Sequence, residues 1–76
     1  MLPLTKRQRE AKAWIEEYTK SHNNVSPSFA EIAEGLGTTA TGAVYLVKAL
    51  KKKGHATTTF GMWRSVQLIP ESHTQL

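Results

Sequence analysis

The stretch SPSFAEIAEGLGTTATGAVYLVKALKKKG, residues 26–54, holds two amphipathic segments with only a short, glycine-containing gap between them. Within each segment apolar residues recur every three or four positions, which is the spacing of one face of an α-helix. We therefore predict helices over about 29–36 and 40–53. Two helices joined by a short turn that contains glycine form a helix-turn-helix, and this motif sets the expected fold.

Local signals indicate where these two helices begin and end. Ser28 is a strong N-cap residue, and Glu31 occupies the reciprocal position of a capping box. Gly37 is the natural left-handed stop for the first helix. Either Thr38 or Thr39 can cap the helix that follows.

Patterns on either side of the motif complete the predicted fold. Thr5 and Gln8 have the capping-box spacing, and the apolar residues after them predict a helix over about 6–21. The sequence after the motif is rich in Thr, Val and aromatic residues and alternates in polarity, which favours strands. We predict a hairpin with strands at about 55–60 and 63–69.

The expected fold class is mainly α with a small β-hairpin, a winged helix-turn-helix of three helices plus a two-stranded wing. The 76 residues suffice for one small domain, which we place at 1–70, followed by a flexible tail at 71–76. The chain has no cysteine, so a compact apolar core must stabilise it in place of disulfides or a thiolate zinc site. The residues expected in this core are Trp14, Ile15, Tyr18, Phe29, Ile32, Leu36, Leu46, Val47, Leu50, Val66 and Leu68.

Charge is distributed unevenly along the chain, whose formal net charge is +4. Residues 1–37 carry equal numbers of basic and acidic side chains, whereas residues 38–70 contain basic side chains and no carboxylate. A long segment without carboxylates indicates a surface that meets an anion. The alternative interpretation of the consecutive lysines at 51–53 is that they complement the dipole at a helix C-terminus.

Several classes of function are disfavoured. No apolar run approaches the roughly 20 residues of a membrane span, and the polar start is unlike a secretory signal, so we expect a cytoplasmic protein. His22, His55 and His73 lack the spacing of a metal site, and there is no glycine-rich phosphate loop. We expect no enzyme activity, cofactor, metal ion or small-molecule ligand.

The front of the second helix of the motif carries residues that packing alone does not explain, because Thr and Gly are poor helix formers. In a helix-turn-helix this helix enters the major groove of DNA, and its N-terminal residues reach base edges. We therefore assign base reading to Thr39, Ala40, Thr41, Gly42 and Tyr45. The competing interpretation is that the Thr and Gly residues only cap and fray the helix.

A second set of residues is expected to contact DNA phosphates and the groove beside the wing. The amide end of the helix at 29–36 suits a phosphate, lysines neutralise others, and arginine at a wing tip suits the backbone or the minor groove. The set comprises Ser28, Lys48, Lys52, Met62, Trp63 and Arg64. The alternative for the aromatic side chains of Phe60 and Trp63 is packing back onto the core.

With these segments in place, the chain resembles the DNA-binding domain of the LexA repressor family. The matching pieces, which run from Leu4 to about Leu68, are LTKRQRE, SPSFAEIAEGLG, VKALKKKG and FGMWRSVQLI. The resemblance implies a winged helix-turn-helix that binds operator DNA and represses transcription. The run from Gly37 to Leu50 is one residue shorter than in typical members, and the outward residues differ. We therefore expect a different operator.

LexA proteins continue into a self-cleaving serine/lysine protease domain that dimerises, whereas this sequence stops at Leu76. We expect either an isolated domain of a longer protein or a small stand-alone regulator of phage or plasmid type, and we favour the second. The expected partner is double-stranded DNA, bound by two copies on half-sites about one turn apart. The alternative function is a protein-interaction module that binds a host regulator or polymerase, with Met62 and Trp63 as a hydrophobic anchor.

Overall fold

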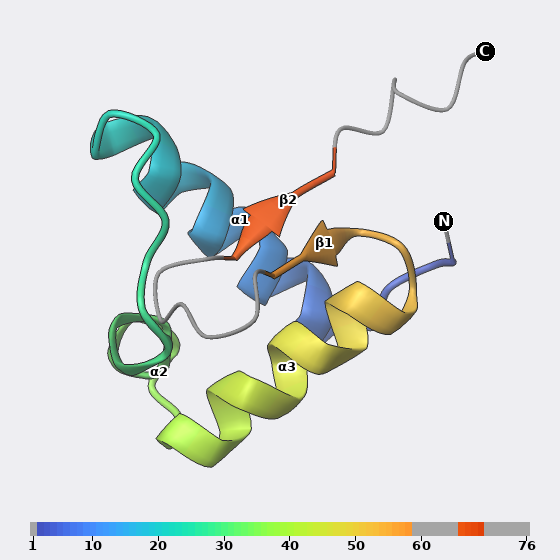
Figure 1. The fold of residues 1–76 in the computed structure, drawn as a ribbon. Coiled ribbons are helices and arrows are strands. Elements are labelled where there is room, and N and C mark those ends of the chain that lie inside the picture. Colours follow the sequence, from blue (N-terminus) through green and yellow to red (C-terminus); the bar gives the residue numbers. More distant parts are fainter. Residues whose placement is uncertain (1, 59–65, 70–76) are drawn as a thin grey trace, which may run out of the picture.

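Residues 2–58 and 66–69 are described in the computed structural model of the chain. They form three helices and a two-stranded antiparallel sheet, so the predicted winged helix-turn-helix class is confirmed (Figure 1). The elements are α1 (Lys6–Ser21), α2 (Phe29–Leu36), α3 (Ala40–Lys52), β1 (Ala56–Thr57) and β2 (Gln67–Leu68).

The helices begin at the residues that the sequence indicated. Thr5 caps α1 in a complete capping box, because its side chain accepts from the Gln8 N–H while the Gln8 side chain accepts from the Thr5 N–H. Ser28 and Glu31 form the same reciprocal pair at the start of α2. Of the two threonines considered for α3, Thr39 is the cap.

Glycines turn the chain at the ends of the two motif helices. Gly37 ends α2 with a φ of 67°, in the left-handed region that glycine adopts without strain. The third helix ends at Lys52, one residue earlier than predicted, and Lys53 is its C-cap. Gly54, with a φ of 86°, then directs the chain into β1.

The strands pair in the predicted antiparallel direction, with Ala56 opposite Leu68. Val66 is buried and Gln67 is exposed, which agrees with the predicted alternation. Both strands are shorter than predicted, because residues 55, 58, 66 and 69 are described and lie outside them. Residues 59–65, which belong to the predicted hairpin, and the predicted tail lie outside the described residues.

The core lies where the three helices and the sheet meet, and most of the predicted core residues belong to it. Its buried members are Ala11, Ile15, Ile32, Ala33, Ala43, Val47, Leu50, Ala56 and Val66. Five of the predicted residues are partly buried and pack against these: Trp14, Phe29, Leu36, Leu46 and Leu68. Tyr18 is half-buried, and its hydroxyl donates to the Glu31 carboxylate at 3.1 Å, so it links α1 to the start of α2.

Close packing of α1 on α2 depends on Gly35. A Cβ atom at this position would overlap the indole ring of Trp14. Any side chain on residue 35 would therefore displace the Trp14 ring or push α2 away from α1. No helix in the described part of the chain has the length and apolar character needed to cross a membrane.

Candidate nucleic-acid interface

One stripe of side chains runs along α3 on the side opposite the core. Thr41, Tyr45, Lys48 and Lys52 follow one another at intervals of four, three and four residues, so they share one helical face. All four are exposed, and Tyr45 is 67% exposed, the most of any large apolar residue described. We call these four residues the α3 stripe. It presents hydroxyl groups at the front of the helix and ammonium groups at the back.

The opposite face of α3 fixes the orientation of this stripe. Ala43, Val47 and Leu50 are buried in the core, and each is at most 2% exposed. Ala40 is exposed and Val44 is half-buried, and both flank the stripe. Rotation of α3 about its axis would lift the three buried side chains into water, so the core itself holds the stripe outward.

The start of α3 has an internal reason for its glycine. Thr39 accepts the Gly42 N–H through its hydroxyl at 3.1 Å. A Cβ atom on Gly42 would collide with the hydroxyl oxygen of Thr38, which leans over the first turn. Gly42 is also only half-exposed. This glycine therefore has a structural reason of its own, because a side chain at residue 42 would have to displace the Thr38 hydroxyl.

The N-terminus of α2 is capped by side chains of its own first turn. Ser28 is 1% exposed, its hydroxyl accepts the Glu31 N–H at 3.1 Å, and its N–H donates to the Glu31 carboxylate at 2.9 Å. The Ser28 side chain therefore holds α2 in shape and is not part of the outer surface. Any phosphate contact at this end must use backbone amides, beside a carboxylate that already lies there.

The lysines near the end of α3 differ in whether their ammonium groups already bind another part of the protein. Lys48, Lys51 and Lys52 are exposed. Lys53 is engaged, because its ammonium group donates to the Gln8 side chain at 2.7 Å and its carbonyl accepts the Leu2 N–H. Within residues 2–58 and 66–69, the ion pairs that we observe are both on α1, so no carboxylate neutralises the exposed lysines of α3.

Two side chains, Arg7 and His55, make long-range contacts that had no signal in the sequence. The Arg7 guanidinium donates to the Leu36 carbonyl at 2.7 Å, which satisfies a free acceptor at the end of α2. Buried His55 contacts the Leu2 carbonyl through Nε2 at 2.6 Å and the Lys12 ammonium through Nδ1 at 3.1 Å. Since a carbonyl only accepts and an ammonium only donates, Nε2 carries the imidazole proton in this arrangement.

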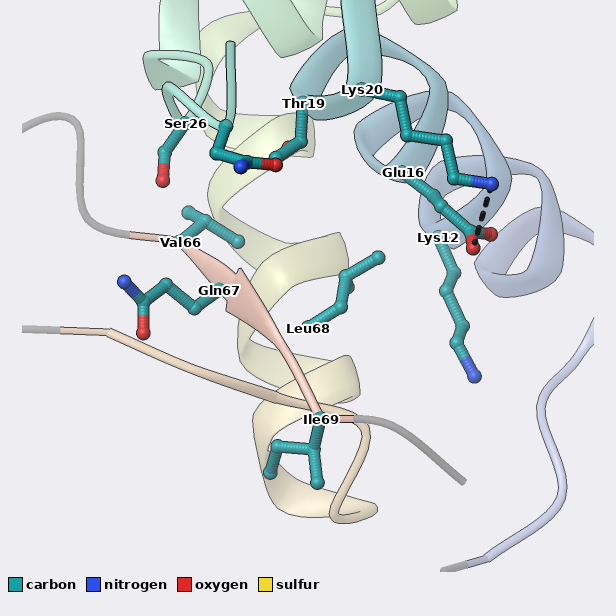
Figure 2. A pocket seen from close by; sticks show the side chains of 10 residues that line it. Lys12, Glu16, Thr19, Lys20, Ser26, Val66, Gln67, Leu68 and Ile69 are labelled. Atoms are coloured by element: carbon teal, nitrogen blue, oxygen red, sulfur yellow. Dashed lines mark ion pairs between the residues drawn. The ribbon is translucent and has the colours of Figure 1, made fainter. Parts of the chain in front are cut away.

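A separate hollow of about 680 Å³ lies between α1 and the last described strand (Figure 2). Glu16 and Lys20, which form an ion pair at 3.6 Å, line one side, and Val66 and Leu68 line the other. None of the described residues that line it belongs to α3. The hollow is therefore not part of the candidate interface. The described ranges also contain no group of three His, Asp or Glu side chains that could hold a metal ion.

The structure thus brings together Thr39, Ala40, Thr41, Gly42 and Tyr45 at the front of α3, with Lys48 and Lys52 behind them. It separates Ser28 from this surface by burying it. The predicted wing residues Met62, Trp63 and Arg64 lie outside the described residues.

A family model described as the LexA DNA binding domain matches residues 1–65. The chain belongs to the LexA DNA-binding domain family. Among curated proteins, the LexA repressor of Koribacter versatilis is 37% identical over 70 residues, covering 91% of this chain and 33% of that protein. The LexA repressor of Leptospira interrogans serogroup Icterohaemorrhagiae serovar copenhageni is 35% identical over 72 residues, covering 95% of this chain and 35% of that protein.

The similarity covers most of this chain but only part of each relative. This LexA-type chain spans about a third of the length of the curated relatives that it matches. The matched residues contain the whole helix-turn-helix, including the α3 stripe. The resemblance found in the sequence is therefore confirmed for the DNA-binding domain of the family.

Proposed function

We propose that this chain is a sequence-specific regulator that binds operator DNA and represses transcription, with α3 in the major groove. The observation that carries the proposal is the α3 stripe, an exposed helical face with hydroxyls in front, lysines behind and no carboxylate between them. Membership of the LexA DNA-binding domain family supports the same partner.

The dimensions of α3 suit this partner. An α-helix with its side chains is about 10–12 Å across, and the major groove is about 12 Å wide. Along the helix axis, Lys48 and Lys52 lie about 10 Å and about 16 Å from Thr41, at about 1.5 Å per residue. With the front of α3 on the base edges, the two lysines lie where the phosphates of the groove wall pass.

In this arrangement the base-reading residues are Thr39, Ala40, Thr41, Gly42 and Tyr45. Lys48 and Lys52 neutralise phosphates. At α2 the phosphate contact is assigned to the backbone amides next to Ser28, because the Ser28 hydroxyl is already engaged. Met62, Trp63 and Arg64 are assigned to the wing contact on the basis of the sequence.

Repression follows from occupancy of a promoter, which excludes polymerase. One domain offers a small interface, so useful specificity needs two copies on half-sites about one helical turn apart. Such a regulator acts in the cytoplasm of a prokaryotic cell.

A selection on random duplex DNA at two salt concentrations tests the proposal. We expect a recovered site made of two related half-sites, and an affinity that falls steeply as salt rises, because bound phosphates release counterions. A protein-interaction module gives the opposite result, with no enriched sequence and a partner contact that changes little with salt.

Single variants then assign the phosphate contacts. Arg64→Ala and Lys48→Ala should each weaken binding to all sequences and flatten the log–log salt slope by about one unit. The matched control is Lys20→Ala on α1, whose side chain pairs with Glu16 away from α3 and whose loss should leave the slope unchanged. If Lys20→Ala flattens the slope as much as Lys48→Ala, the assignment of α3 to DNA fails.

A further inference from the structure

The front of α3 lacks the side chains that form paired hydrogen bonds to purines. Arg or Lys reads guanine and Asn or Gln reads adenine in this way, yet residues 38–47 contain none of these four types. The first long cationic side chain is Lys48, two turns into the helix. Apart from the tyrosine ring, the front of α3 therefore exposes small side chains that end in methyl and hydroxyl groups.

The structure also shows which of the threonine hydroxyl groups at the start of α3 is available to a ligand. The Thr39 hydroxyl accepts the Gly42 N–H, and the Thr38 hydroxyl leans against Gly42 at the first turn. The Thr41 side chain, by contrast, is exposed, and within the described residues no hydrogen bond engages its hydroxyl. Its methyl group, the Cβ of Ala40 and the half-buried Val44 form an apolar margin along the first two turns.

We propose that this margin reads the C5-methyl groups of pyrimidines in the major groove, which means thymine in ordinary DNA and 5-methylcytosine in modified DNA. The inference rests on the proposed function and names what its base-reading surface recognises. The C5-methyl group is the one methyl group on the base edges of the major groove. A surface of Ala and Thr methyl groups is complementary to it, whereas it offers neither the two donors that read guanine nor the donor–acceptor pair that reads adenine.

The small size of these side chains also supports recognition of C5-methyl groups. A contact from Ala40 requires the helix backbone itself to lie close to the base edges, because only one carbon projects from it. A long side chain at the same place would hold the helix away. The absence of a side chain at Gly42 and the small residues at Ala40 and Thr41 permit that close approach.

Replacement of single thymines by deoxyuridine in the selected site tests the proposal, because it removes only the methyl group. We expect the dissociation constant to rise about fourfold at one to three positions of each half-site, the ratio that corresponds to burial of one methylene-sized group. Replacement of the same thymine pair by a cytosine pair should weaken binding further, and 5-methylcytosine at that position should recover part of the loss.

Variants of Thr41 and Ala40 connect this effect to the helix. Thr41→Ser removes the methyl group and keeps the hydroxyl, whereas Thr41→Val keeps methyl groups and removes the hydroxyl. Thr41→Val should retain the deoxyuridine effect, and Thr41→Ser should abolish it at one position. Ala40→Gly should abolish it at a neighbouring position. Thermal unfolding of each variant checks that the fold is intact.

The outcomes separate this inference from the function on which it rests. If a specific site is found but deoxyuridine has no effect and 7-deazaguanine weakens binding, purine reading is correct and the methyl proposal is overturned. If the deoxyuridine effect is present but unchanged in Thr41→Ser and Ala40→Gly, α3 is not its source and the proposal again fails. If no duplex is bound in preference to another, the proposed sequence-specific function itself is wrong.

Discussion

The first turns of α2 and α3 are built in different ways, although they belong to one motif. At α2, Ser28 and Glu31 satisfy each other reciprocally, and the serine is almost fully buried. At α3, Thr39 caps the helix from an exposed position, and Gly42 stands where α2 has a glutamate. The first turn of α2 is thus shielded from solvent, whereas the first turn of α3 is exposed to it.

The difference indicates that the two helices of the motif have different roles. A carboxylate at the start of α3 would complete the capping box and favour the helix, yet it would also place negative charge at the face proposed to meet DNA. The helix that supports the motif therefore has the fuller cap, and the helix that faces outward has the weaker one. The fuller cap belongs to α2, and the more exposed first turn belongs to α3.

The largest expected effect comes from removal of the two caps. Ser28→Ala should lower the free energy of unfolding by about 2 kcal/mol, because the buried hydroxyl that accepts the Glu31 N–H is lost, and Thr39→Ala by about 1 kcal/mol or less, because water can replace an exposed cap. Urea unfolding of both variants measures the difference. Equal losses would mean that the two starts do not differ in the way described.

A negative charge introduced at the first turn of α3 should weaken the binding of DNA. In a Thr38→Ala background, which makes room for a side chain, Gly42→Glu should bind DNA about tenfold more weakly than Gly42→Gln, a difference of about 1.4 kcal/mol. The two side chains have nearly the same shape, so only the charge differs. Equal affinities at low salt would show that the start of α3 lies away from the phosphates.

The collision between residue 42 and Thr38 can be tested through stability alone. In the Thr38→Ala background, Gly42→Ala should raise the free energy of unfolding by about 1 kcal/mol, the usual advantage of alanine over glycine inside a helix. With Thr38 present, the same change should give a clearly smaller gain, because the added Cβ meets the threonine hydroxyl. Thermal and urea unfolding of the four proteins in this cycle give the coupling directly.

The smallest expected effect concerns the other end of α2. Arg7→Ala should lower the free energy of unfolding by about 0.5 kcal/mol, since the lost hydrogen bond to the Leu36 carbonyl is charged but partly exposed to water. Lys6→Ala, at the neighbouring exposed position, is the control and should have less effect. A larger loss for Lys6→Ala would argue against a role for Arg7 in closing α2.

Much of the fold could be predicted because its signals are local. A capping box spans four residues, so Thr5 with Gln8 and Ser28 with Glu31 mark the first turns of α1 and α2 within a single short window. Gly37 marks a stop for the same reason. The spacing of apolar residues then gives the buried face of each helix, and with it the outward stripe.

The remaining contacts could not be predicted, because they join residues far apart in the chain. Arg7 and Leu36 are 29 positions apart, and His55 and Leu2 are 53 apart. No short pattern encodes such a pair. In the candidate site, Ser28 could be identified as a cap from its neighbours, but its near-complete burial depends on how α1 and α2 meet. The reason for Gly42 was missed because it lies in the rotamer of Thr38.

The isolation of the α3 stripe from the rest of the molecule has an evolutionary consequence. In the described part of the chain, no hydrogen bond or ion pair ties its four side chains to the scaffold, and the helix is held in place by its buried face and its two ends. Substitutions at these positions are therefore nearly neutral for folding. A lineage can alter its target sequence step by step without passing through unstable intermediates, and a library randomised at the stripe should yield mostly folded proteins with new preferences.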